Sequence, residues 1–245
     1  GLGTSTSAEA KEYFKRMDIM EYQIHDKKDR DSVNKAFHTD LADDRKLWIR
    51  DYLRDPGEID YTVKHVPIKD FIDKELVLYS CANVNRSIPS IMDGLKPSQR
   101  KVLYCCSKRG LTKELKVAQL AGYVSEHSAY HHGEMSLNGT IVGMAQTFVG
   151  HNNINLLEPC GQFGTRMDGG SDSASPRYIF THLTRDAYRI YSTDDNVLLD
   201  YNDDDGMQIE PKFYLPTIPM ALANGFDGIA TGFSSKCPCF NPDDL

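Results

Sequence analysis

Arginine and tyrosine stand side by side at Arg177 and Tyr178, shortly after the glycine-rich segment 161–170. A tyrosine hydroxyl can attack phosphorus, but its reference pKa is about 10, so a neighbour must favour loss of the proton. A guanidinium beside it would stabilise the charge that builds on the phosphate oxygens. The plainer interpretation is a strand edge, where tyrosine is common. The dipeptide by itself favours the strand edge.

Other residues of suitable chemistry lie upstream. Arg86 begins a basic stretch, and His131 and His132 precede an expected helix. An imidazole in this place can donate to a phosphate or relay a proton, and a helix N-terminus favours anions. Each residue also has a structural interpretation, because the histidines can cap the helix and Arg86 can pair with a carboxylate. The combination, rather than any single residue, indicates phosphate chemistry.

Charge is unevenly distributed along the chain. The net charge of −7 argues weakly against a nucleic-acid partner. Lysine and arginine nonetheless dominate the stretch 86–116, whereas acidic residues collect at 194–210. A local basic surface fits a phosphate partner, and a solvated helix face would explain the same charges equally well.

The apolar pattern predicts the elements that must position these residues. Thr6 and Glu9 have the spacing of a capping box. The expected helices cover residues 8–18, 32–53, 71–78, 98–109 and 113–123, with one more inside 132–150 and a short one before 191. The buried stripes are expected to hold Val102, Leu103, Leu137, Ile141, Met144 or Ala145, and Phe148.

Three short helices followed by a glycine-rich strand pair at 154–180 predict a winged helix-turn-helix domain. In such folds one helix enters the major groove of DNA. The segment 209–233 combines glycine, proline and alternating apolar residues, which predicts strands and turns that begin another domain. The fold class is therefore α+β.

Composition limits the remaining possibilities. The chain is 40% hydrophobic and 26% charged, which is typical of a soluble globular protein, and it has no apolar run of membrane-spanning length. Six cysteines lack zinc-site spacing and no secretory signal is visible, so reduced intracellular thiols are expected. No phosphate-binding loop of the GxxxxGK[ST] type occurs, so the chain shows no means of hydrolysing ATP. The acids at 203–205 are expected on an exposed loop rather than at a metal.

The two ends suggest a piece of a longer protein. The opening Gly1-Leu2-Gly3 is expected to form a turn, and "CFNPDDL" at the other end does not resemble a finished terminus.

Five segments together closely resemble the DNA-cleavage core of eukaryotic-type (type IIA) DNA topoisomerase II, and the resemblance covers essentially the whole chain. "GLGTSTSAEAKEYF" is similar to the end of the Toprim domain. The winged-helix domain and the start of the tower domain are represented by "RSIPSIMDGLKPSQRKVL", "KVAQLAGYVSEHSAYHHGEMSL", "AQTFVGHNNINLLEPCGQFGTRMDGGSDSASPRYIFT" and "IEPKFYLPTIPMALANGFDGIATGF". The implied domains are a Toprim tail at 1–28, a helical linker at 29–75, the winged-helix domain at 76–192 and the start of a mixed α/β tower at 193–245.

The resemblance also implies roles for single residues. Tyr178 matches the nucleophile that joins a DNA 5′ phosphate, and Arg177, Arg86 and His132 match its catalytic helpers. The resemblance implies DNA contacts for Lys96, Arg100 and Lys101, with His131 expected among them. Ile229 matches the isoleucine that is wedged between base pairs, and such apolar wedges kink a duplex.

The sequence departs from the family pattern at Ser98 and Ala230, where glycine is usual, and at Ser171, where lysine is common. The change at Ser171 would remove one phosphate contact. The segment between Leu53 and Phe71 is short for a nuclear member, which leaves a protist, fungal or viral source open.

The family resemblance implies an ATP-dependent enzyme that cleaves and religates double-stranded DNA for strand passage, relaxation and decatenation. Its partners would be duplex DNA and a second copy of the chain, and no membrane. Magnesium and ATP would both bind outside this chain, so the segment alone is expected to be inactive. The nucleus is the expected location, or a viral factory or the cytoplasm for a viral member.

Two other interpretations stay open. A non-catalytic winged-helix module would use Arg177 and Tyr178 only as wing contacts. A tyrosine recombinase or type IB topoisomerase also combines tyrosine with arginine and histidine, but it attaches to a 3′ phosphate. The polarity of a covalent link therefore separates these classes.

Overall fold

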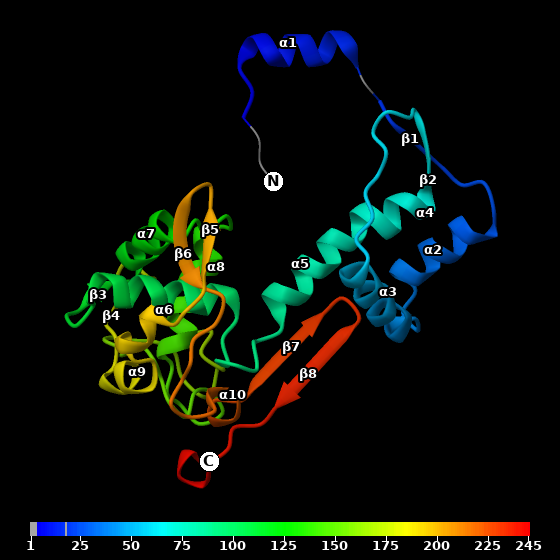
Figure 1. Ribbon diagram of the computed structural model, residues 1–245. Coiled ribbons are helices and arrows are strands. Elements are labelled where there is room, and N and C mark those ends of the chain that lie inside the picture. Colours follow the sequence, from blue (N-terminus) through cyan, green and yellow to red (C-terminus); the bar gives the residue numbers. More distant parts are fainter. Residues whose placement is uncertain (1–3, 18) are drawn as a thin grey trace. The chain divides into compact units, whose positions relative to one another are not determined.

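The computed structural model describes residues 4–17 and 19–245 (Figure 1). The chain divides into two compact units, which are described separately. The first holds the chain up to Asn83 together with Thr231–Phe233, and the second holds Val84–Ala230 and Ser234–Leu245. The turn predicted at residues 1–3 lies outside the described residues.

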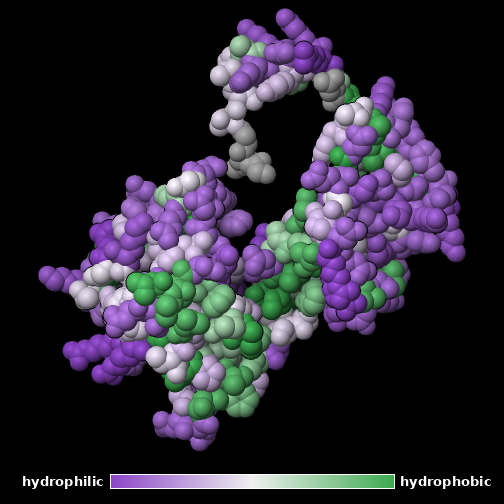
Figure 2. Space-filling model, in the orientation of Figure 1, coloured by the Kyte–Doolittle hydropathy of each residue, from purple (hydrophilic) through white to green (hydrophobic). Residues whose placement is uncertain are grey.

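The first unit is mostly helical, with one short parallel strand pair. β1 pairs with β2 so that Tyr22 lies opposite Val66. The surface of α2 is largely hydrophilic (Figure 2). Its elements are α1 (Ser7–Arg16), β1 (Glu21–Gln23), α2 (Lys27–Phe37), α3 (Ala42–Arg54), β2 (His65–Pro67), α4 (Ile68–Phe71), the π-helical turn η1 (Ile72–Leu76) and the first part of α5 (Val77–Ser87).

Capping boxes begin two of these helices. The predicted box at α1 is confirmed, since the Glu9 amide donates to Thr6 Oγ1 at 3.3 Å and the Thr6 amide donates to Glu9 Oε2 at 2.7 Å. Asp26 and Asp29 form an equivalent box at α2. Backbone donors, first that of His25, lower the pKa of Asp29.

The single helix predicted at 32–53 is wrong, because the chain leaves the helix at His38 and forms α2 and α3 instead. The Arg45 guanidinium donates to the carbonyls of Lys35 and His38, at 3.1 and 2.7 Å. These carbonyls belong to the end of α2, where a helix leaves its last acceptors unsatisfied. A side chain from the second helix therefore caps the first.

The second unit packs helices around one hydrophobic core, with short strands at its margins (Figure 1). β3 and β5 pair antiparallel with β4 and β6, and β7 pairs with β8. Beyond the end of α5, the elements are α6 (Pro97–Arg109), β3 (Leu115–Lys116), α7 (Val117–His127), α8 (Glu134–Ala145), β4 (Phe180–Thr181), α9 (Arg185–Ile190), η2 (Thr193–Val197), β5 (Tyr201–Asp204), β6 (Met207–Pro211), α10 (Met220–Ala223), β7 (Phe226–Ala230), β8 (Phe233–Cys237) and η3 (Pro242–Asp244).

The predicted inward positions within α6 and α8 are confirmed, whereas Phe148 lies beyond the end of α8 and is half-buried. Val102 and Leu103 of α6 are buried, as are Leu137, Ile141 and both Met144 and Ala145 of α8. The helix expected at 113–123 begins later, at Val117, because Leu115 and Lys116 pair with Thr181 and Phe180 instead. The winged-helix arrangement and the α+β class both hold.

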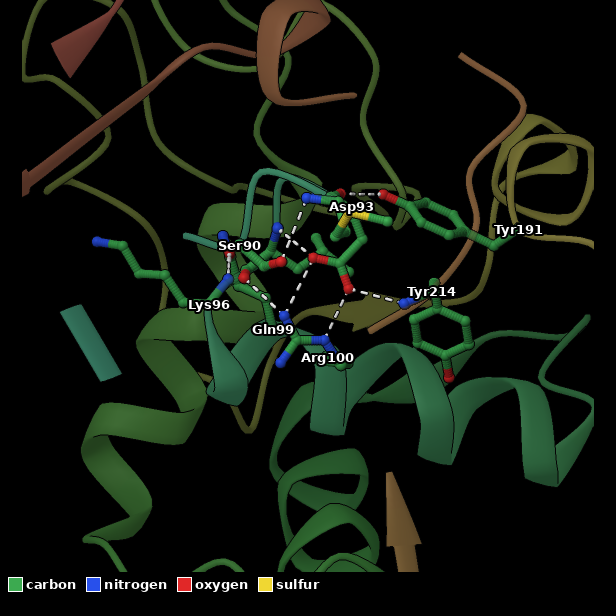
Figure 3. Close-up of polar contacts among 9 residues, drawn as sticks. Ser90, Asp93, Lys96, Gln99, Arg100, Tyr191 and Tyr214 are labelled. Atoms are coloured by element: carbon green, nitrogen blue, oxygen red, sulfur yellow. Dashed lines mark hydrogen bonds and ion pairs between the residues drawn. The ribbon is translucent and has the colours of Figure 1, made fainter. Parts of the chain in front are cut away.

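A buried aspartate holds the connection between α5 and α6. Asp93 is completely buried, and its carboxylate accepts from Arg100 Nε at 2.7 Å and from Arg100 Nη2 at 3.0 Å (Figure 3). The same carboxylate accepts from the amides of Leu95 and Tyr214, each at 3.0 Å. The Asp93 carbonyl accepts from the Tyr191 hydroxyl at 2.9 Å, and burial raises the pKa of this phenol. The side chain of Asp93 therefore joins its own loop to α6 and to the chain before α10, and its carbonyl adds the end of α9.

This network leaves no lone pair of the carboxylate idle, which is the condition under which a buried ion pair is tolerated. Gly94, the next residue, has a φ of +71°, and a Cβ there would lie 2.6 Å from the Ala221 amide nitrogen. Only glycine fits this backbone approach. The loop therefore has both a polar and a steric anchor.

The division of the chain near Asn83 lies slightly beyond the predicted boundary at 75–76. The boundaries predicted at 28–29 and 192–193 have no counterpart in this division and stay predictions. Among the described residues, no helix combines the length and apolar character that crossing a membrane would require.

We expect Asp93→Asn to lower the local stability of segment 88–103 by about 3 kcal/mol, because it leaves the buried Arg100 guanidinium without its counter-charge. Native-state hydrogen exchange with mass detection on the full-length protein measures this opening free energy. Asp205→Asn is the matched control, since Asp205 is exposed and its φ of +51° suits asparagine. Equal exchange in the two variants would contradict the assigned role of Asp93.

Candidate functional site

A groove of about 640 Å³ in the second unit gathers most of the residues singled out from the sequence. They come from the end of α5, the start of α6, the loop before α8 and strand β7. Those lining the groove are Arg86, Lys96, Lys101, His131, His132 and Ile229. The sequence therefore identified groups that are far apart along the chain and close together in the fold.

The groove wall carries an apolar side chain beside cationic ones. Ile229 is 76% exposed on β7, an unusual position for a large aliphatic residue in a strand. Lys96 points away from the Asp93 network (Figure 3), and its Nζ lies 3.5 Å from the Asp227 carbonyl. An exposed apolar wedge next to cations suits a ligand that offers both phosphates and stackable faces.

The two histidines follow a strained turn. Ser128 is buried, Ala129 has a φ of +47°, and Tyr130 is 8% exposed with its ring edge-on to that of His132 at 5.4 Å. His131 Nε2 lies 3.0 Å from the Asp204 carboxylate on β5. The two histidines belong to the loop 129–133 before α8, the histidine loop. The loop is thus held from the core side and from the β5–β6 hairpin.

Arg100 requires a correction. Its expected role as a DNA-backbone contact does not fit its position, because its side chain is 6% exposed and its guanidinium donates to the Asp93 carboxylate and the Leu95 carbonyl. Periodicity could not separate it from Lys96, which lies four residues earlier and reaches the groove. Arg100 supports the site from inside.

Lys101 occupies an intermediate position. It lines the groove, but its Nζ lies 2.8 Å from Glu210 of β6, donates to the Ser128 carbonyl, and is only 15% exposed. Most of its charge is therefore matched within the protein. Its predicted contact with DNA stays a prediction, with less free charge than the sequence suggested.

Tyr178 projects from the wing. Its side chain is 67% exposed, while the next residue, Ile179, is 1% exposed in the core. The Arg177 guanidinium carbon lies 5.1 Å from the centre of the Tyr178 ring. Residues 176–178 form a turn in which the Tyr178 amide donates to the Ser175 carbonyl at 2.9 Å, so the phenol lies outside while Ile179 enters the core. The Arg177 guanidinium lies against the face of the exposed ring.

The wing is an irregular, glycine-rich loop rather than a regular strand pair. Cys160 and Phe180 exchange backbone hydrogen bonds at 3.0 and 2.9 Å, and the Gln146 side chain of the segment after α8 donates to the carbonyls of Phe163 and Gly170. The predicted strand pair is therefore reduced to isolated bridges. The position of the wing against α8 depends on one buried amide.

Tyr178 and Arg177 do not line the groove that holds Arg86 and His132. Of the expected helpers of Tyr178, Arg86 and His132 line this groove and Arg177 lies beside the phenol. Across residues 4–17 and 19–245, His, Cys, Asp and Glu form no group of three or more that could hold a metal ion.

Beyond the exposed Met135 of its first turn, the outward face of α8 is made of small residues between two hollows. Gly139 and Gly143 border a groove of about 770 Å³ on one side and another of about 720 Å³ toward the wing. Ser136 and Thr140 lie on the first of these. A helix with such a smooth ridge can approach another surface closely.

Comparison with known proteins decides the family. A family model described as DNA gyrase/topoisomerase IV matches residues 86–245, and one for the C-terminal associated domain of TOPRIM matches residues 1–84. The chain belongs to the type II DNA topoisomerase family. The boundary between the two matches falls beside the division of the structure at Asn83.

Similar proteins of this topoisomerase family come from several eukaryotes. A probable DNA topoisomerase 2 of Dictyostelium discoideum is 54% identical, and the DNA topoisomerase 2 of Saccharomyces cerevisiae is 52% identical, each over 100% of this chain. The chain spans only 16% and 17% of their lengths. It is therefore similar to one part of these larger topoisomerases.

A solved structure agrees with the fold. The crystal structure of the Plasmodium falciparum topoisomerase II DNA-binding, cleavage and re-ligation domain matches with a TM-score of 0.85 and 50% identity. The match covers 100% of this chain and 34% of that one. The α+β fold predicted from the topoisomerase resemblance is confirmed.

Sequence reasoning missed the residues that support this topoisomerase segment from behind. Asp93, Gln146, Asp204 and Glu210 hold the site through contacts that span from 7 to 109 positions along the chain. No local pattern marks them. Only Asp93 carried a signal, as an acid within a basic stretch.

We expect Gly170→Ala to loosen the wing, because a Cβ there would lie 2.4 Å from Gln146 Nε2. Gly169→Ala is the matched control: its φ of +59° imposes similar backbone strain, but nothing lies within 4 Å of the added carbon. The rate of hydrogen exchange across residues 161–176 of the full-length protein should rise at least about tenfold more in Gly170→Ala than in Gly169→Ala. Equal effects would show that Gln146 does not hold the wing.

Proposed function

We propose that this chain is the DNA-cleavage segment of a type II topoisomerase and that Tyr178 is its nucleophile. The observation that carries the proposal is the exposed Tyr178 phenol on a wing anchored by Ile179, with Arg177 beside it. An aromatic side chain left outside the core at such a position is placed to meet a large external substrate. The similarity to topoisomerases over the whole chain supports the same role.

In the proposed reaction, Tyr178 Oη attacks a backbone phosphorus of DNA. An O–P bond to the tyrosine forms, the bond from phosphorus to the 3′ oxygen breaks, and the phenolic proton leaves as the 3′ hydroxyl gains one. Religation reverses these changes, so the energy of the phosphodiester is conserved in the link. Arg177 would stabilise the charge on the non-bridging oxygens.

The groove would hold the neighbouring backbone. Arg86 and Lys96 would contact phosphates, and His132 would donate to one or relay a proton. Ile229 would enter a base-pair step and bend the duplex. Because Tyr178 lies outside the groove, the bound duplex must bring the two regions to adjacent phosphates.

The ridge of α8 fits the groove-reading helix of a winged-helix domain. Its small residues permit close approach to DNA, and the hollows on both sides leave room for the backbones that flank a major groove. Direct base reading would be weak, since Gly139 and Gly143 offer no side chain. The segment would therefore recognise the shape of DNA more than its sequence.

Further partners follow from the family. We propose a second identical chain that completes a two-strand cut, and magnesium and ATP bound outside this chain for strand passage, relaxation and decatenation. The segment alone would then be inactive. The nucleus is the proposed location, although one relative, 52% identical, is named as mitochondrial.

A winged-helix module without catalysis is the second candidate. It is favoured by the separation between Tyr178 and the groove, because binding needs no alignment between them. Under this alternative Arg177 and Tyr178 would contact the backbone only. The two candidates differ in whether a covalent adduct forms.

We expect Tyr178→Phe in the full-length enzyme to abolish covalent DNA trapping, with DNA affinity changed less than about threefold, since the exposed hydroxyl leaves no buried group unpaired. The measurement uses supercoiled plasmid and magnesium, followed by detergent, protease and identification of the blocked end. A blocked 5′ end in the unaltered enzyme is expected. A blocked 3′ end would indicate the recombinase-like class, and no blocked end with retained binding would indicate the non-catalytic module.

A further inference from the structure

The β5–β6 hairpin reaches the histidine loop through one side chain. Asp204 Oδ2 lies 3.0 Å from His131 Nε2, although the residues are 73 positions apart. Both line the groove that contains Arg86 and His132. The hairpin carries no group of the expected catalytic set, but this contact links it to the loop that carries His132.

The hairpin is a firm platform for that contact. Glu210 of β6 is 4% exposed and pairs with Lys101 of α6 at 2.8 Å, and Lys101 also donates to the Ser128 carbonyl. At the turn, the Gly206 amide donates to Asp203 at 2.9 Å. The buried ion pair fixes the hairpin to α6, and Lys101 also joins both of them to the end of α7, from which the histidine loop leaves.

The histidine loop needs such support. Ala129 has a φ of +47°, a region that costs a non-glycine residue roughly 1 kcal/mol. Tyr130 is held in the core, whereas the side chain of His131 is 74% exposed. The bond to Asp204 therefore holds the exposed His131 from the hairpin side, while the Tyr130 ring contacts His132 from the core side.

We propose that Asp204 is a positioning residue for the cleavage reaction: it holds His131 and thereby directs His132 into the groove. This inference rests on the proposed function. A carboxylate only accepts, so the ring nitrogen facing Asp204 carries the proton. His131 then directs that proton to Asp204, and its neighbour His132 is the imidazole that meets the phosphate.

Other charges face the histidines from every side of the groove. Arg86 ends α5, Lys96 and Lys101 lie at α6, and Glu210 lies on β6 behind Lys101. Asp204 is the acid that reaches His131 itself. Removing the Asp204 carboxylate changes both the orientation of the histidine loop and the local charge. Comparing Asp204→Ala with Asp204→Asn separates these two effects.

The test uses single-turnover cleavage of a duplex by the full-length enzyme. Asp204→Ala should lower the maximal cleavage rate about tenfold, with the DNA dissociation constant changed less than about twofold, the size expected for one charge-assisted hydrogen bond. Asp204→Asn keeps an acceptor and should recover to within about threefold of the unaltered rate. Asp205→Asn, the adjacent exposed control, should match the unaltered enzyme. In a His131→Ala background, Asp204→Ala should have no further effect.

Hydrogen exchange of segment 129–133 provides a readout that does not require cleavage. Exchange should rise in Asp204→Ala and stay unchanged in Asp204→Asn and Asp205→Asn. Unchanged exchange, or a rate equal to that of Asp205→Asn, would overturn the proposal. If the unaltered enzyme forms no adduct, the proposed function fails separately, and raised exchange would still show that Asp204 holds the loop.

Discussion

The buried pair between Asp93 and Arg100 is the constraint on which the second unit depends. A carboxylate without solvent must have every lone pair satisfied, and Asp93 achieves this with donors from α6, from its own loop and from the chain before α10. The loop between α5 and α6 is therefore fixed at its centre. Arg86 and Lys96 lie at its two ends, so the same pair sets the spacing of the cations that line the groove.

The expected site is built in two parts with different supports. The groove depends on buried polar contacts, namely the Asp93–Arg100 and Lys101–Glu210 pairs. The wing depends on close backbone packing, where Gln146 fills the space beside Gly170. The groove and the wing therefore have separate supports. Such an arrangement suits a substrate that stays bound while one of its bonds is broken and re-formed.

Much of this arrangement could be predicted from the sequence, and the failures have physical causes. The capping box at Thr6 and the inward residues of α8 up to Ala145 follow from local spacing. The break at His38 was missed because Arg45 caps the helix end through tertiary contact. Arg100 was misplaced because Lys96 and Arg100 are both basic and four residues apart, and only the buried Asp93 distinguishes them. Asp204 and Glu210 carry no sequence signal, since their partners are distant along the chain.

The most direct test of this account compares Lys96→Gln with Arg100→Gln in the full-length enzyme by the salt dependence of duplex binding. The slope of log affinity against log salt concentration reports the number of phosphate contacts. Partial unfolding lowers the fraction of binding-competent protein, and hence the affinity, without changing this slope. Lys96→Gln should reduce the slope by about 1, whereas Arg100→Gln should leave it unchanged while lowering stability. A reduced slope for Arg100→Gln with unaltered stability would contradict the account, because Arg100 would then be a surface contact with DNA.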